Sequence, residues 1–162
     1  MLLQFLYQDK LPGHLQYTRE VDVGSDDFAL LIAAYVTADK YCIEELQNKI
    51  VDLLAEWCKY RCFLAHAITR LTDADLVDSK LRKLLLQNVA HSLVLVGYEA
   101  ACEKDKGLAS FVSGGSVNSV DLLRATLTLA LMPDREDPAH VEDICDVYHV
   151  HKKTKKCEKA KE

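Results

Sequence analysis

Hydrophobic residues recur at steps of three and four along most of this chain, which is the spacing of an α-helix that buries one face. The clearest stripe lies within about 43–60, and its members are Ile43, Leu46, Ile50, Leu53, Leu54 and Trp57. The same spacing predicts further helices over about 25–40, 62–70, 79–103 and 120–132. Strict alternation of apolar and polar residues, which is typical of strands, is rare. The pattern therefore predicts a mainly α fold.

Residues that start and stop helices agree with these boundaries. Ser25 or Asp26 can cap the first helix and Ser79 the long one, because a short side-chain oxygen accepts unpaired amides of a first turn. Gly97 interrupts the long helix, which predicts a kink or a close helix contact there. Pro133 ends the last helix because it lacks an amide hydrogen.

The stretch 104–119 separates the long helix from the last one. It contains three glycines and four serines, so we interpret it as a linker. Its Gly114-Gly115 pair does not join a strand to a helix, so it is not a phosphate-binding loop. The helix that follows is predicted from the apolar stripe Val120, Leu123, Leu127 and Leu131.

One segment has a specific resemblance. Residues 31–46, LIAAYVTADKYCIEEL, resemble the central signature of BTB/POZ domains, in which a helix ends in Ala-Asp-Lys-Tyr and the next begins at Ile-x-x-Leu. Residues 5–10 are similar to the family's Phe-x-Tyr-Thr-Gly-Lys segment. Residues 78–85 and 145–151 resemble a helix start and the C-terminal Cys-x-x-Tyr-His-x-His segment of BTB proteins of the fungal type.

The resemblance implies a helical hairpin from the C-terminal part of a BTB/POZ fold, followed by further helices. It implies a protein-interaction function, as an adaptor or a transcription-associated scaffold. The elements that begin such a domain and form its usual dimer interface would lie before Met1, as would the motif that cullin adaptors use. We therefore expect a truncated or degenerate relative. For such a protein the resemblance implies neither dimerisation nor binding to a cullin-type ubiquitin ligase scaffold.

This interpretation divides the chain into three parts. Residues 1–60 are the C-terminal part of a BTB/POZ-like domain, 61–132 a helical extension, and 133–162 a flexible tail, first acidic and then rich in Cys, His and Lys. Other proteins are the expected partners, bound through apolar helix faces. The candidate contact residues are Leu6, Tyr7, Tyr35, Tyr41 and Trp57. Trp57 has two interpretations: it ends an amphipathic stripe, which favours a place in the core, and the alternative is a hydrophobic anchor for a partner.

Charge narrows the classes of partner. The net charge is −5, and residues 152–162 hold six Lys and two Glu, so the rest of the chain carries −9. Such an acidic body lacks the basic face that binds nucleic acid. No run reaches the roughly 18 to 20 apolar residues of a membrane-spanning helix, and the apolar start has no basic residues of a secretion signal. We expect an intracellular protein, in the nucleus or cytoplasm, whose six cysteines are free thiols.

A Cys/His cluster near the C-terminus is the one candidate for metal binding. Cys145, His149, His151 and Cys157 have the spacing C-x3-H-x-H-x5-C. Two thiolates and two imidazoles suit tetrahedral zinc, and zinc would order a segment that cannot order itself. The spacing is not that of a standard zinc finger. The alternatives are therefore a zinc-stabilised helical regulatory protein and a flexible tail with free Cys and His, without any cofactor.

The remaining polar residues do not form a catalytic set. His66 and His91 fall within predicted helices at or near apolar faces. Cys62 with His66 would lack an orienting acid and oxyanion donors. We therefore predict that the chain is not an enzyme. A face of the second helix is expected to be solvated because it is acidic, with Glu44, Glu45, Asp52 and Glu56.

Overall fold

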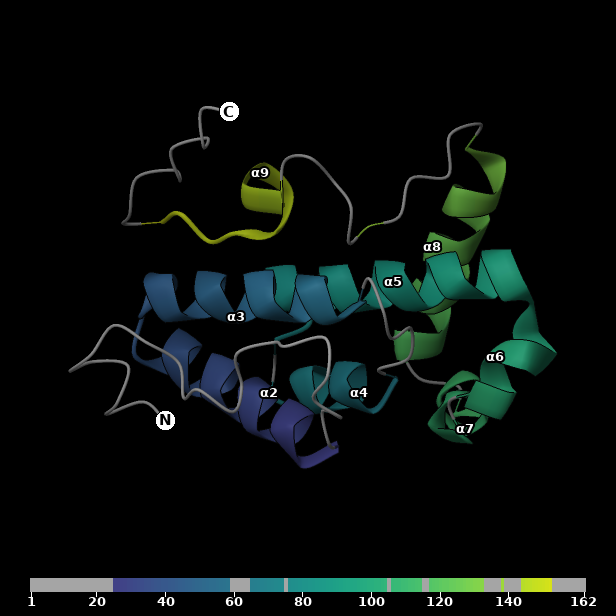
Figure 1. The fold of residues 1–162 in the computed structure, drawn as a ribbon, viewed down its shortest axis with the longest axis horizontal. Helices are drawn as coiled ribbons and strands as arrows, with labels where there is room; N and C mark the ends of the chain where they lie inside the picture. The colour runs from purple at the N-terminus through teal and green to yellow at the C-terminus, as the bar shows by residue number, and fades with distance from the viewer. Residues whose placement is uncertain are drawn as a thin grey trace.

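The computed structural model describes residues 25–58, 65–74, 76–104, 106–114, 117–132, 138 and 144–152, and statements on structure refer to these. All regular elements of this part of the chain are helices, which confirms the predicted mainly α fold (Figure 1). They are α2 (Ser25–Lys40), α3 (Glu44–Cys58), α4 (Ala65–Asp73), α5 (Lys80–Val96), α6 (Tyr98–Lys104), α7 (Lys106–Ser113), α8 (Val117–Leu131) and α9 (Ile144–Tyr148).

Helices α2 and α3 form the expected hairpin. The link is tight because Cys42 adopts a left-handed conformation, with φ of 55°. The amide of Cys42 donates to the carbonyl of Asp39 at 3.0 Å, and that of Ile43 to the carbonyl of Ala38 at 2.8 Å. These bonds satisfy carbonyls at the end of α2, so the chain reverses direction without leaving them unpaired. The two helices pack through buried residues such as Leu31 and Leu46.

Helix α5 lies at the centre of the molecule and contacts α3, α4, α6, α8 and α9. Ser79 caps its N-terminus as predicted, because its hydroxyl accepts the amide of Arg82 at 3.2 Å. The helix ends at Gly97, whose φ of 83° disfavours a side chain. The single helix expected over about 79–103 is therefore two helices, α5 and α6, which meet at this glycine. In Figure 1, α3 and α5 form a middle layer between α2 and α4 on one side and α9 on the other.

The prediction of a linker over 104–119 is wrong for most of its length. Residues 106–113 form α7, in which Leu108 and Phe111 are buried. These two residues are one helical turn apart, and they pack this short helix against the core despite its glycine and serine content. Helix α8 begins at Val117, three residues before its predicted start.

A buried arginine joins three helices. Arg82 of α5 is only 4% exposed. Its guanidinium donates to Asn118 at 2.7 Å and to Asp121 at 2.9 Å on α8, and to the Thr72 hydroxyl on α4 at 3.1 Å. A buried cation needs a counter-charge and several acceptors, and this network supplies both. It fixes α8 across α5 and α4.

Candidate functional site

Two surfaces have features that the core does not explain. The first is formed by residues 144–152, which cross the polar side of α3 and the start of α5 (Figure 1). The second is the outward face of α8.

The segment 144–152 is held by polar contacts to residues far away in the sequence. The Asn48 side chain donates to the carbonyl of Val150 at 3.0 Å and accepts the amide of Val150 at 2.7 Å. Lys80 donates to the carbonyl of Val147 at 2.8 Å. Backbone groups of the segment are thus satisfied by side chains of α3 and α5, which gives a short peptide a fixed position.

A buried tyrosine anchors the same segment. Tyr148 is only 2% exposed, and its hydroxyl donates to Gln87 of α5 at 2.6 Å. Ile144 and Val147 pack against the core beside it. The expectation of a flexible tail with little core is therefore wrong for residues 144–152. Contacts with α3 and α5, which the local sequence does not show, hold this part in place.

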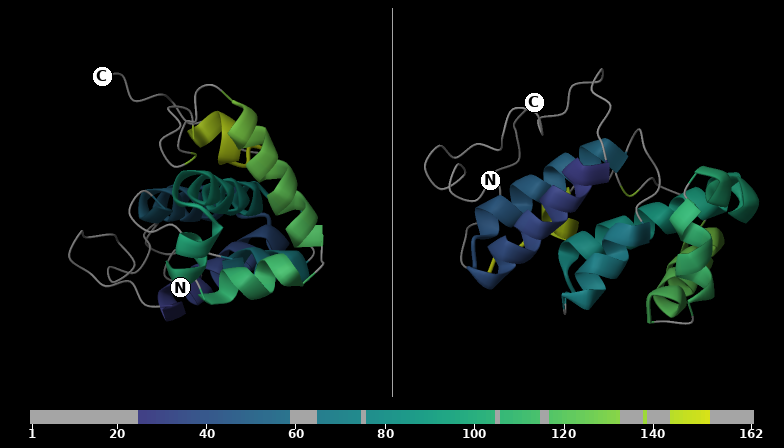
Figure 2. Two further views of the ribbon diagram at one scale, coloured as in Figure 1. Left: turned by 90° about the vertical axis from the view of Figure 1, so that its right-hand side faces the viewer. Right: turned by 90° about the horizontal axis from the view of Figure 1, so that it is seen from below.

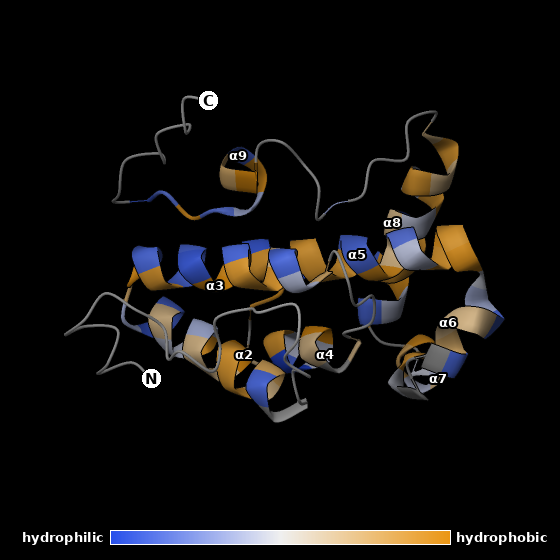
Figure 3. Cartoon of the chain, in the orientation of Figure 1, coloured by the Kyte–Doolittle hydropathy of each residue, from blue (hydrophilic) through white to orange (hydrophobic). Residues whose placement is uncertain are grey.

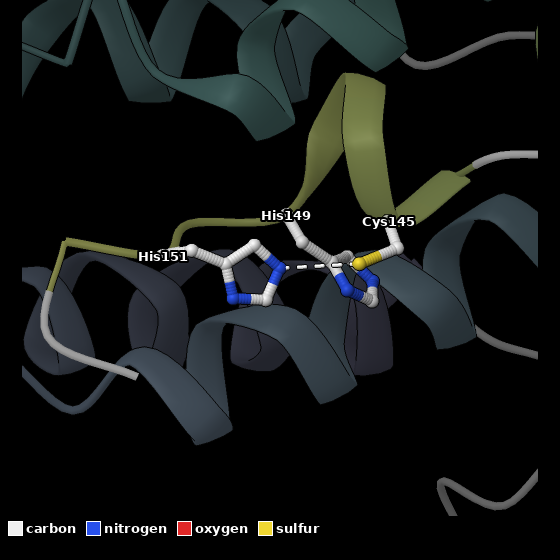
Figure 4. Close-up of side chains that lie close together, drawn as sticks. All are labelled: Cys145, His149 and His151. Carbon is white, nitrogen blue, oxygen red and sulfur yellow. Dashed lines mark hydrogen bonds between the residues drawn. The ribbon is translucent and has the colours of Figure 1, made fainter. Parts of the chain in front are cut away.

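Three side chains that could bind a metal come together on this segment. Cys145, His149 and His151 each offer a ligand atom, and these atoms all lie within 4.8 Å of one another. The Cys145 sulfur and the Nε2 of His151 are 3.2 Å apart, and Figure 4 shows both imidazoles directed to the side on which the sulfur lies. The rings of His149 and His151 are 5.9 Å apart between centroids. The structure thus brings together three of the four residues of the predicted zinc set, and Cys157 lies outside the described residues.

A carboxylate from another helix contacts this group. The Nε2 of His149 lies 2.7 Å from an oxygen of Asp52 on α3, and His149 is 7% exposed. The acidic face expected on this helix is therefore not simply solvated. Glu44 is buried, and Asp52 pairs with a histidine 97 residues away in the sequence. Segment 144–152 occupies part of the polar side of α3.

A polar hollow lies beside the Cys/His group. Its lining includes both histidines, together with Tyr35, Asp39 and Lys80. Burial raises the pKa of Tyr35 to about 12, and the negative charge of Asp39 acts in the same direction. This tyrosine is therefore neutral at ordinary pH and cannot serve as an anionic ligand there.

The second surface is a row of apolar side chains on α8. Its members, hereafter the α8 row, are Val117, Val120, Leu123, Leu127 and Leu131. They are between 55% and 83% exposed. The stripe from which the sequence predicts this helix thus faces solvent. The residues of α8 that face the core lie on the other side, where Asn118, Leu122 and Leu129 are buried. In Figure 2, left, α8 lies along the edge of the molecule.

The predicted contact residues differ in their exposure to solvent. Trp57 and Tyr35 are buried, and the Trp57 ring packs edge-on against Phe28 at 4.9 Å between centroids. Neither offers a surface to a partner in this structure, so the core alternative for Trp57 is the one observed. Tyr41 is exposed at the turn between α2 and α3. Leu6 and Tyr7 lie outside the described residues.

Among the described residues, the histidines and cysteines outside the cluster are not gathered into a site. His91 is buried within α5, and the side chain of His66 is not among those that the structure describes. Of the described cysteines, Cys42, Cys102 and Cys145 are free thiols. The sequence did not identify Arg82 as notable, and it identified the stripe of the α8 row only as the sign of a helix, not as an exposed surface. The row could have been singled out because α8 carries apolar residues on both of its faces.

In comparisons with known proteins, no family model, no curated protein and no solved structure matches the chain. None of the described helices is long and apolar enough to cross a membrane.

Proposed function

We propose that this chain is a non-catalytic protein-interaction module that binds an amphipathic helix of a partner protein on the α8 row. The observation that carries the proposal is the exposure of five large apolar side chains on one face of a single helix (Figure 3 shows the apolar C-terminal turns of α8 in orange). Scattered exposed hydrophobic residues are ordinary, but a contiguous row is typical of a binding surface.

The geometry of α8 supports this interpretation. At 100° per residue, the centre of the α8 row lies about 180° from the centre of its buried residues. The helix is therefore apolar on two opposite faces and has only two charged residues, Asp121 and Arg124. Helices that are apolar all round are normally buried on all sides. Here α5 covers one face, and a partner would cover the other.

The shape and size of the row favour a single helix as the occupant. Its residues are spaced three or four apart, which makes a straight ridge that fits the groove of a helix laid along it. Each half-exposed Leu or Val leaves about 1 kcal/mol of burial free energy unrealised, which suits reversible association more than a permanent complex. The net charge of −5 favours a partner with basic flanking residues over a second copy of this chain.

The resemblance of residues 31–46 to the BTB/POZ signature supports the same function class. Under this proposal the α2–α3 hairpin corresponds to the C-terminal helices of that fold, and the chain acts as an adaptor or a transcription-associated scaffold. The free thiols of Cys42, Cys102 and Cys145 support a location in the reducing nucleus or cytoplasm.

Site-specific photo-crosslinking tests the proposal. A photoreactive amino acid replaces Leu127 within the α8 row in one form of the chain, and the exposed Glu45 on α3 in a control form. After irradiation in cells, we expect a discrete adduct with another protein only from position 127. The added substitution Leu123→Glu should abolish it while the circular dichroism spectrum stays unchanged. Equal labelling at both positions, or an adduct made of two copies of this chain, would contradict the proposal.

A further inference from the structure

We propose that Cys145, His149 and His151 bind one zinc ion, which fixes segment 144–152 across α3 and α5. This inference concerns a surface other than the α8 row and does not depend on partner binding there. Three structural features support it in addition to the spacing of Cys and His in the sequence. They are the proximity of three ligand atoms, a carboxylate that contacts one of the histidines, and hydrogen bonds that hold the backbone of the segment.

Local backbone structure explains how one short segment can present three ligands. The amide of His149 donates to the carbonyl of Cys145 at 3.3 Å, so these two residues are one helical turn apart and share a face. After α9 ends, residues 149–151 have no helical structure. Alternate residues of an extended chain point to the same side, which places His151 beside His149. A turn of helix followed by three non-helical residues thus gathers all three side chains.

The donor atoms suit zinc. One thiolate sulfur and two imidazole nitrogens are the ligand types that zinc binds most readily in proteins. A tetrahedral zinc ion holds such atoms roughly 3.3 to 3.5 Å apart, as follows from bonds of about 2.3 Å to sulfur and 2.0 Å to nitrogen. The 3.2 Å between the Cys145 sulfur and His151 Nε2 is already close to this range. The ligand atoms of the whole group all lie within 4.8 Å of one another, so the side chains must move closer together to reach this range.

Asp52 supplies the contact that orients a metal-binding histidine. In zinc sites, the ligand imidazole usually donates its other N–H group to a carboxylate, which fixes the tautomer and strengthens the ligand. The 2.7 Å contact between His149 Nε2 and Asp52 has this form. Under the proposal, His149 donates from Nε2 to Asp52 and binds zinc through Nδ1. Asp52 is then a positioning residue that connects the metal to α3.

The backbone of the segment is positioned independently of the metal. Asn48 holds Val150 by two hydrogen bonds and Lys80 holds Val147, on either side of His149. The ligands therefore sit on a peptide that two helices already hold in place, which lowers the conformational cost of assembling the site. The polar hollow beside both histidines gives space for a water molecule as the fourth ligand. The ion would act as a clamp on the C-terminal segment.

Metal analysis of the purified full chain tests the site. After dialysis against excess zinc and removal of loosely bound ions, we expect about one zinc per chain. Cobalt substitution should give the d–d bands of a tetrahedral ion and a sulfur-to-cobalt charge-transfer band. Cys145→Ser should remove the charge-transfer band and most of the zinc, whereas Cys42→Ser, which alters an exposed thiol elsewhere, should change neither. Asp52→Asn should weaken zinc binding about 10- to 100-fold without removing the charge-transfer band.

Amide hydrogen exchange tests the clamp. Adding zinc to the metal-free protein should slow exchange of residues 147–151 and leave α2 unchanged, and the Cys145→Ser variant should show no such slowing. Because the helical core does not depend on the metal, circular dichroism should show that this variant is folded. Zinc content below about 0.2 per chain in the wild type, or the same zinc content in the Cys145→Ser variant, would overturn the proposal. Cys145 and His151 would then form only a hydrogen-bonded pair.

Discussion

Arg82 shows how one buried charge can determine the packing of several helices. Its guanidinium is surrounded by acceptors from α4, α8 and the turn before α5, including the carbonyl of Val77 at 3.2 Å. Asp121 supplies the counter-charge at 2.9 Å. The pattern of apolar residues places Leu81, Leu84 and Leu85 in the core, and they are buried. It gives no reason to expect an arginine among them, since the acceptors lie up to 39 residues away.

Replacing Arg82 should therefore destabilise the fold strongly. Arg82→Ala removes the buried guanidinium that Asp121 and Asn118 accept from, and we expect a loss of about 3 to 5 kcal/mol in the free energy of unfolding. Urea denaturation measures this loss. Arg124→Ala is the matched control, because Arg124 contacts the same aspartate at 3.9 Å from an exposed position, and it should cost less than about 0.5 kcal/mol. Similar losses in both variants would show that the buried network does not stabilise the fold.

Tyr35 gives the fold a dependence on alkaline pH. Burial raises its pKa from 10.0 to about 12, so the folded state binds the phenolic proton more tightly than the unfolded state. Its contribution to stability is complete below pH 10 and is lost as the pH rises towards 12. We expect the stability difference between the wild type and Tyr35→Phe to fall by about 2 to 3 kcal/mol over this window. Urea unfolding at a series of pH values measures it, and a difference that does not change with pH would refute this explanation.

At the scale of elements, the sequence predicts best where the information is local. Helices α2 to α5 follow from apolar spacing, the Ser79 cap and the glycine at 97. Helix α7 was missed because its glycines and serines resemble a linker, although Leu108 and Phe111 suffice to bury one face. Helix α9 is too short for periodicity, and its position depends on Asn48 and Lys80, which are distant in the sequence.

The candidate sites were predictable to different degrees. The Cys/His spacing identified Cys145, His149 and His151 as a group, because residues so close in sequence cannot lie far apart. It could not identify Asp52, which joins the group only through the packing of the segment on α3. On α8, both faces are apolar, so spacing alone cannot show which of them is buried. Leu123 belongs to the outward face only because Arg82 fixes Asn118 and Asp121 on the inward side.

Docking of the C-terminal segment should depend on Asn48. Asn48→Ala removes both hydrogen bonds to the Val150 backbone, and we expect a loss of about 1 to 3 kcal/mol in unfolding free energy. Hydrogen exchange of the Val150 amide should become faster. Glu45→Ala, an exposed change on the same helix, serves as the control and should leave both quantities unchanged. If the Val150 amide exchanges equally fast in the wild type and in Asn48→Ala, the segment is not held in this way.

At the scale of the whole molecule, α5 organises one helical core, and two surfaces extend beyond what that core requires. Segment 144–152 covers polar residues of α3 and brings possible metal ligands together. The α8 row leaves apolar residues in solvent, where they stabilise nothing in the isolated chain. We propose that the residues of this row are apolar because they bind a partner. On this account, the row does not contribute to the stability of the fold.

Paired substitutions on α8 test this central claim most directly. Leu127 is exposed in the α8 row, and Leu122 is buried five residues before it on the same helix. The change to alanine removes the same atoms and has the same effect on helix propensity at both positions. We expect Leu122→Ala to lower the unfolding free energy by about 2 to 5 kcal/mol and Leu127→Ala by less than about 1 kcal/mol. Urea denaturation of the two variants gives both values, and a loss at Leu127 as large as that at Leu122 would contradict the account.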